Sequence, residues 1–271
     1  MGAMSDPPPT RDWLTSTPSA FGGKRVHRLG LATNYGIDAD GVRHAMERGV
    51  NVFLWTSRGK KSLAPPLREA IAGRRDDVIV IGFAAVGLFG WSVRRAAESL
   101  LKELGTDHLD VLLLGWLGVG SAWTTATETA LRTLRESGKI RAFGASIHDR
   151  PRAGQLAESR AVDLLMIRYN AAHPGAEREI FPHVHEKSPS VLAYTATSWR
   201  KLLKSPRGWD GAPMTAGDCY RFQLSNPHVD LAVTGPANRA QLDENLDALE
   251  RGPLSSEEES RFRAFGKAVH G

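Results

Sequence analysis

The chain has 271 residues, of which 41% are hydrophobic, and its 35 basic and 30 acidic side chains give a formal net charge of +5. The charges are spread along the chain, no apolar run approaches the roughly 18 residues of a membrane span, and no nucleic-acid-binding motif is present. We therefore expect one large hydrophobic core, a small-molecule partner, and neither a nucleic-acid nor a membrane partner.

The first residues are expected to lie outside the fold. MGAMS resembles an expression remnant, and the Pro-rich stretch through Pro18 has the composition of a loose arm. We predict a flexible arm over residues 1–20 and a single domain over residues 21–271. The single cysteine, Cys219, excludes an internal disulfide and is interpreted as a small buried hydrophobe in a helix. A reducing, cytoplasmic compartment fits this cysteine usage.

Short apolar runs with almost no alternation follow one another along the chain, a pattern typical of parallel strands buried on both faces. They predict strands at Val26–Thr33, Val50–Leu54, Val78–Phe83, Asp110–Leu114, Ile140–Ser146, Leu164–Tyr169, Val191–Thr195 and Leu231–Thr234. Helical stretches separate these runs, and three of them begin with capping-box spacing: Thr125 with Glu128, Asn238 with Gln241, and Ser255 with Glu258.

Eight strand-then-helix units in this order predict an α/β protein with a (β/α)8 TIM barrel as its only domain. An open, doubly wound sheet is the alternative. It would normally bring a glycine fingerprint after its first strand, and the turn here is ATNYGI instead of GxGxxG. In a barrel, functional side chains gather at the carboxyl ends of the strands.

The eighth unit carries the clearest binding signal. Gly235 stands at a strand end, and Asn238 caps the helix that follows, so its free N–H groups and dipole can attract an anion. Arg239 in the first turn adds a cation. The same helix offers hydrogen bonds toward a base or a ribose from Gln241, Glu244 and Asn245. Simple capping of the last barrel helix is the competing interpretation.

Several segments resemble the aldo-keto reductase family, over almost the whole chain from Arg28 to about Leu249. The segments that carry the resemblance are LGLAT at Leu29, AMERGVNVF at Ala45, LLKELGTDHLDVLLL at Leu100, LRESGKIRAFGAS at Leu134, RYN at Arg168, LAYTA at Leu192 and TGPANRAQLDENL at Thr234. The resemblance implies an oxidoreductase that uses NADP or NAD on a small carbonyl or imine compound.

The resemblance also implies roles for individual residues. Ser146 matches the serine that contacts the nicotinamide amide, and Tyr194 matches the aromatic residue that stacks on the nicotinamide ring. The residues that match pyrophosphate and adenosine binders are Thr195, Gly235, Gln241, Glu244 and Asn245. Two further binding positions depart from the family, since Ile147 and Met166 replace an asparagine and a glutamine.

The catalytic positions of the family are apolar or glycine in this chain. Leu54 or Trp55 replaces the aspartate, Phe83 the lysine, Gly115 the histidine and Gly59 the tyrosine. The family reaction needs a tuned general acid. The resemblance therefore implies a remodelled active site without the usual four residues.

Other residues near predicted strand ends are candidate catalytic groups: Tyr35, His148, Arg168 and His173. Asp149 beside His148 suggests an oriented imidazole, and an arginine on a barrel wall requires a partner or an anion. Solvated loop residues, helix caps and an internal salt bridge are the alternatives. Lys60 and Lys61 are weaker candidates for a cation. No metal is expected, because His183, His185 and His173 lack a completing carboxylate or thiolate.

Three interpretations of function stay open. The first, which we prefer, is a nicotinamide-dependent oxidoreductase in which Tyr35, His148 or water supplies the proton. The second is a barrel that binds a dinucleotide or another small molecule without turnover. The third is a lyase or isomerase with His148 or His173 as base. The sequence does not determine the substrate, the choice between NAD and NADP, or the oligomeric state.

Overall fold

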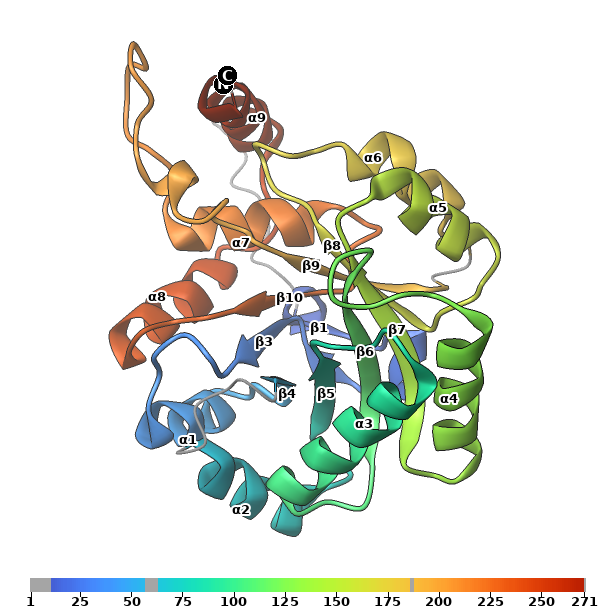
Figure 1. Ribbon diagram of the computed structural model, residues 1–271. Helices are drawn as coiled ribbons and strands as arrows, with labels where there is room; N and C mark the ends of the chain where they lie inside the picture. The colour runs from blue at the N-terminus through green and yellow to red at the C-terminus, as the bar shows by residue number, and fades with distance from the viewer. Residues whose placement is uncertain (1–10, 57–62, 186–187, 271) are drawn as a thin grey trace.

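Eight parallel strands close into a barrel in the computed structural model, which describes residues 11–56, 63–185 and 188–270 (Figure 1). The strands are β3 (Leu29–Ala32), β4 (Val52–Thr56), β5 (Ile79–Ala84), β6 (Leu109–Leu117), β7 (Ile140–Ile147), β8 (Leu164–Arg168), β9 (Ser190–Tyr194) and β10 (Leu231–Thr234). Pairing of β10 with β3 completes the circle. This closure confirms the predicted (β/α)8 barrel, and the open-sheet alternative was wrong.

Helices surround the barrel on its outside (Figure 1). They are α1 (Ala39–Glu47), α2 (Ala64–Arg74), α3 (Gly90–Leu104), α4 (Thr125–Glu136), α5 (Arg150–Glu158), α6 (Ala176–Glu179), α7 (Ala216–Ser225), α8 (Arg239–Leu249) and α9 (Ser256–His270). Cys219 is buried in α7, as expected. No helix within the described ranges is both long and apolar enough to cross a membrane.

The core has two layers because strand side chains alternate between the inside and the outside of the barrel. The inner layer includes Leu54, Phe83 and Met166, and the outer layer, between strands and helices, includes Phe53 and Trp55. Trp55 is fully buried in that outer layer. It therefore does not line the inside of the barrel.

The segment before the barrel is packed against it from Trp13 onward, whereas a flexible arm was expected over residues 1–20. The short strands β1 (Thr15–Ser16) and β2 (Val26–His27) pair antiparallel. Phe21 belongs to the inner core layer, and the indole Nε1 of Trp13 donates to the carbonyl of Leu249 at 2.9 Å. The predicted first strand, Val26–Thr33, is divided at Arg28 because its first two residues pair with β1 instead of with the barrel.

Helix starts follow the predicted capping signals with one shift. Ser255 and Glu258 form the expected reciprocal capping box. The box predicted at Thr125 and Glu128 is formed one residue earlier, where Thr124 caps α4 and Thr127 returns the bond. The run TTATE offers two overlapping registers, and Thr124 is the residue that keeps an extended backbone.

Candidate functional site

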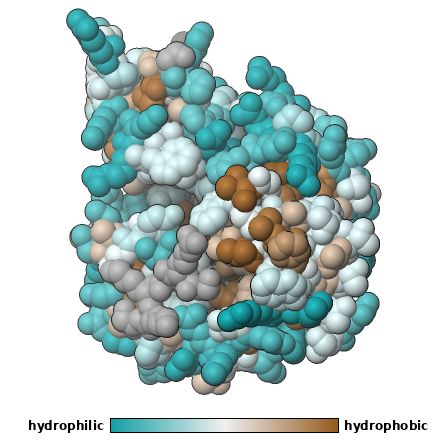
Figure 2. Space-filling model, viewed as in Figure 1, coloured by the Kyte–Doolittle hydropathy of each residue, from teal (hydrophilic) through white to brown (hydrophobic). Residues whose placement is uncertain are grey.

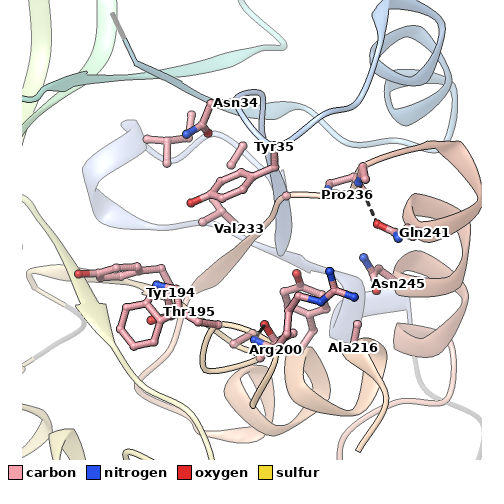
Figure 3. A pocket seen from close by; sticks show the side chains of 18 of the residues that line it. Asn34, Tyr35, Tyr194, Thr195, Arg200, Ala216, Val233, Pro236, Gln241 and Asn245 are labelled. Carbon is pink, nitrogen blue, oxygen red and sulfur yellow. Dashed lines mark hydrogen bonds between the residues drawn. The ribbon is translucent and has the colours of Figure 1, made fainter. Parts of the chain in front are cut away.

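A cavity of about 800 Å³ opens at the carboxyl ends of the strands, where the fold was expected to hold its site (Figure 3). Its lining has an apolar floor from the barrel interior and a polar wall from β9, β10 and the loops that follow them. The described floor side chains include Ala32, Leu54, Phe83, Ala85, Met166 and Val233.

Hydrocarbon fills the floor at positions 83 and 115, where the resemblance places a catalytic lysine and a catalytic histidine. A Cβ atom at Gly115 would lie 2.2 Å from Cε1 of Phe83, so the phenyl ring occupies the space that a side chain at 115 needs. The same ring packs edge-on against Trp116 with centroids 5.3 Å apart. The two replacements are thus coupled, because Phe83 requires glycine at 115. Gly59, Lys60 and Lys61 lie outside the described residues.

The polar wall contains three buried oxygen atoms without a hydrogen-bond partner among the described residues. They are Ser146 Oγ, Thr195 Oγ1 and Asn245 Oδ1, and all three residues line the cavity. A buried polar atom without a partner costs about 1–3 kcal/mol. Because all three residues line the cavity, a small side-chain rotation would present these oxygen atoms to a ligand with hydrogen-bonding groups, and the residues present fit a dinucleotide.

Tyr194 and His148 form a polar pair at the rim. The Tyr194 hydroxyl lies 3.0 Å from Nε2 of His148. Burial raises the pKa of Tyr194, while the nearby Ser146 hydroxyl and the charge of Arg168 act against that rise. Burial and then the charge of Arg168 lower the pKa of His148, so its neutral form is favoured. The neutral imidazole can accept the proton of the phenol or donate to its oxygen.

Tyr35 lies in the cavity, as predicted, but against β10. Figure 3 shows its ring beside Val233. A Cβ atom at Gly235 would lie 2.3 Å from Cδ2 of Tyr35, so the glycine is needed for this close approach. The tyrosine is 62% exposed, which leaves its hydroxyl accessible to a ligand.

The start of α8 is only partly available to a ligand. Asn238 Oδ1 accepts from the backbone N–H of Gln241 at 3.0 Å, and Gln241 Oε1 accepts from the N–H of Ala237 at 2.9 Å (dashed in Figure 3). The predicted second bond of this capping box therefore goes to Ala237 and not to Asn238. Arg239 does not line the cavity, and its Nε lies 3.7 Å from Asp243 Oδ2.

Arg200 is a cavity residue that the sequence reasoning missed. It follows β9, lines the cavity, and its guanidinium points toward Asn245 in Figure 3. Its φ is +69°, in the left-handed region that costs a non-glycine residue roughly 1–2 kcal/mol. The direction in which the Arg200 side chain projects depends on this backbone turn.

Of the four candidate catalytic residues, Tyr35 lines the cavity, whereas His148, Arg168 and His173 do not. Arg168 ends β8 in register with Tyr194. The imidazole of His173 packs against His270 with ring centroids 4.9 Å apart. Among the described residues, no group of three or more His, Cys, Asp or Glu side chains could hold a metal ion.

The loops after β5 and β6 expose apolar side chains beside the cavity. Val86, Leu88, Phe89, Trp91 and Val119 are exposed there, and Figure 2 shows apolar side chains gathered on this face. Ala85 and Trp116 join this surface to the cavity floor. We call these five exposed residues the apolar rim.

The model of the Aldo/keto reductase family matches residues 68–205. An NADH-specific methylglyoxal reductase of Escherichia coli is 27% identical over 106 residues, 38% of this chain and 32% of the relative. Methylglyoxal reductase YeaE of the same organism is 28% identical over 145 residues, 51% of this chain and 49% of the relative. This chain thus spans about a third and about half of these relatives' lengths.

Solved structures share the fold along nearly the whole chain. The holo form of aldo-keto reductase AKR11C1 from Bacillus halodurans has a TM-score of 0.78 at 18% identity, covering 94% of this chain and 96% of that chain. An aldo-keto reductase from Klebsiella pneumoniae in complex with NADPH has a TM-score of 0.75 at 23% identity, covering 93% and 95%.

Proposed function

The chain belongs to the aldo/keto reductase family, and from this premise we propose that it is an NAD(P)H-dependent oxidoreductase acting on a small carbonyl or imine compound at a remodelled centre. We also propose that it works in the cytoplasm, where a lone buried cysteine stays reduced.

The observation that carries this proposal is the set of three unpartnered oxygen atoms along the polar wall. Ser146 lies on β7, Tyr194 ends β9, and Thr195 begins the loop after β9. Asn245 lies on α8. Together these residues extend from the barrel axis to its edge, as the contacts of an extended ligand would. When bound, the dinucleotide supplies a hydride. Ser146 and Thr195 would hold the ligand, and Tyr194 would offer its ring face to the nicotinamide.

We assign proton delivery to the rim, because Leu54, Phe83 and Met166 on the cavity floor carry no acidic group. Tyr35 and the Tyr194–His148 pair are the candidate donors. Burial raises the pKa of the deeper Tyr220 to about 12, which makes it a weak acid at neutral pH. An imine that is already protonated would need no donor, so this floor suits imines as well as carbonyl compounds.

A barrel that binds a dinucleotide without turnover is the second candidate. It is favoured by one observation, the Phe83 ring in the space of a side chain at Gly115. The same filling leaves no room for the usual lysine and histidine, and catalysis would be lost altogether if the rim supplied no substitute. A lyase or isomerase with His148 or His173 as base has less support, because neither histidine is among the residues that line the cavity.

The test has two steps. The first is titration of the full chain with NADPH and NADH, followed by quenching of tryptophan fluorescence. Micromolar affinity supports either dinucleotide-binding candidate, and no binding at millimolar cofactor refutes both.

The second step follows cofactor oxidation with a panel of small aldehydes, ketones and cyclic imines. Turnover that falls at least tenfold in Tyr35→Phe or His148→Ala supports the reductase and names the donor. Arg132→Gln, on the outer face of α4, is the matched control. Binding without turnover on any compound leaves the non-catalytic barrel.

A further inference from the structure

Arg168 carries a half-buried guanidinium that no described residue neutralises. It is the last residue of β8, and no carboxylate or hydrogen-bond acceptor within residues 11–56, 63–185 and 188–270 contacts it. The guanidinium lies over the ring of Trp199, whose centroid is 5.9 Å from the guanidinium carbon. Because a buried charge is costly without a counter-ion, this position is suited to an anionic ligand.

The two histidines near Arg168 are held in their neutral forms and do not compensate its charge. Burial and then the charge of Arg168 lower the pKa of His148. Burial lowers the pKa of His173 most, and the charges of Arg168, His270 and Lys201 lower it further. No acidic side chain acts on either histidine in the described part of the chain. This sector of the mouth is therefore positive and uncompensated.

The place of Arg168 in the barrel directs it at the cavity. Residues in register on neighbouring parallel strands project to the same side, and Arg168 is in register with Tyr194, which lines the cavity. The two strands that flank β8 carry Ser146 and Tyr194. Across the mouth lie Phe83, Trp116 and the apolar rim. A molecule over Tyr194 thus meets hydrocarbon on one side and Arg168 on the other.

We infer that Arg168 binds a carboxylate of the substrate, so that the substrates are 2-oxo acids with an apolar or aromatic body. A guanidinium presents paired N–H donors that match the two oxygens of a carboxylate. This inference rests on the proposed function. In the reaction a hydride adds to the keto carbon, the C=O π pair moves to oxygen, and a proton completes the hydroxyl. The dinucleotide is oxidised and the carboxylate is unchanged.

An anion near Arg168 has a second possible source, the pyrophosphate of the dinucleotide. The unpartnered wall atom of Asn245 lies on α8, after β10, so β9 and β10 separate it from Arg168 on β8. This separation favours the substrate as the source. The experiment below tells the two apart by measuring dinucleotide binding separately.

The binding test uses benzoate and its neutral analogue benzamide, titrated calorimetrically into the full chain. We expect benzoate to bind about 10- to 100-fold more tightly, the range for a charge-assisted hydrogen bond. Arg168→Gln should abolish the difference and Arg168→Lys should keep part of it. Arg178→Gln, an exposed arginine on α6, is the matched control and should leave it unchanged.

The turnover test compares benzoylformate with its methyl ester under saturating NADPH. The ratio of their kcat/KM values should exceed ten in the wild type and fall toward one in Arg168→Gln. Equal binding of benzoate and benzamide by the wild type would overturn the inference, and this measurement needs no variant. A preference for benzoate that survives Arg168→Gln would also overturn it.

The NADPH titration separates the possible failures. If Arg168→Gln weakens NADPH binding and leaves benzoate binding unchanged, the anion belongs to the dinucleotide and the inference is overturned. If the wild type binds benzoate over benzamide but no dinucleotide, the proposed function fails while the anion site stands. Dinucleotide binding together with no preference for benzoate refutes the anion site alone.

Discussion

Replacement of Gly115 by alanine tests whether Phe83 fills the floor as the structure shows. The added Cβ would lie 2.2 Å from Cε1 and 2.5 Å from Cζ of Phe83, and 2.9 Å from the carbonyl oxygen of Ala84. All three distances are shorter than normal van der Waals contact. Overpacking of a core position typically costs about 1–3 kcal/mol in the free energy of unfolding. For a domain of this size, about 2 kcal/mol corresponds to a fall in Tm of roughly 4–8 °C.

The pair is best measured as a double-mutant cycle by urea unfolding. Phe83→Leu alone removes ring atoms from the floor, and we expect it to cost about 1–2 kcal/mol. It also clears the space next to position 115, so Gly115→Ala should cost much less in the Phe83→Leu background. The cycle should show a coupling energy of about 1–2 kcal/mol in favour of the double variant.

The Phe83 ring borders the cavity, so it can relieve the clash with the added Cβ at position 115 by turning into the cavity. That movement would spare stability but fill ligand space, so NADPH affinity should fall in Gly115→Ala instead. Additive costs in the cycle, together with unchanged NADPH affinity in the single variant, would refute the coupling of the two residues. The catalytic histidine of the family could then be restored at 115 without touching Phe83.

Three further measurements test the polar wall and the pH response. Tyr194→Ala should weaken NADPH binding by about 1–3 kcal/mol if the ring stacks on the nicotinamide, whereas Tyr194→Phe should keep most of the affinity; equal losses in fluorescence titrations would contradict stacking. Arg200→Gln should weaken NADPH more than NADH if its guanidinium meets a 2′-phosphate, while the same change at Arg239 should leave the ratio of the two Kd values unaltered, and the reverse pattern would reassign the cation. Burial lowers the pKa of His27 below 6.5. At a pH just below 6.5 the unfolded chain therefore binds a proton at His27 and the folded chain does not. The free energy of unfolding should rise with pH up to about 6.5 and then level off. A similar slope of urea midpoints against pH in His27→Asn would show that another group is responsible.

The candidate site was only partly visible in the sequence. Ser146, Tyr194, Thr195 and Asn245 were assigned to the cofactor from the resemblance, and the structure brings all four to one cavity. Arg239 was expected to supply the cation, but it lies near Asp243 outside the cavity lining. Whether an arginine faces a cavity depends on the backbone direction at its position, which a residue type does not encode.

The sequence by itself determined the eight strand-then-helix units, since buried apolar runs and capping residues act over a few neighbouring positions. It also determined that Leu54, Phe83 and Gly115 carry no ionisable group. Only the tertiary structure decided that the Phe83 ring occupies the space beside Gly115, and that Arg168 lies next to Tyr194 without a carboxylate partner among the described residues. These relations join strands far apart in the chain, and closure of the barrel sets their distances, so no local pattern could contain them.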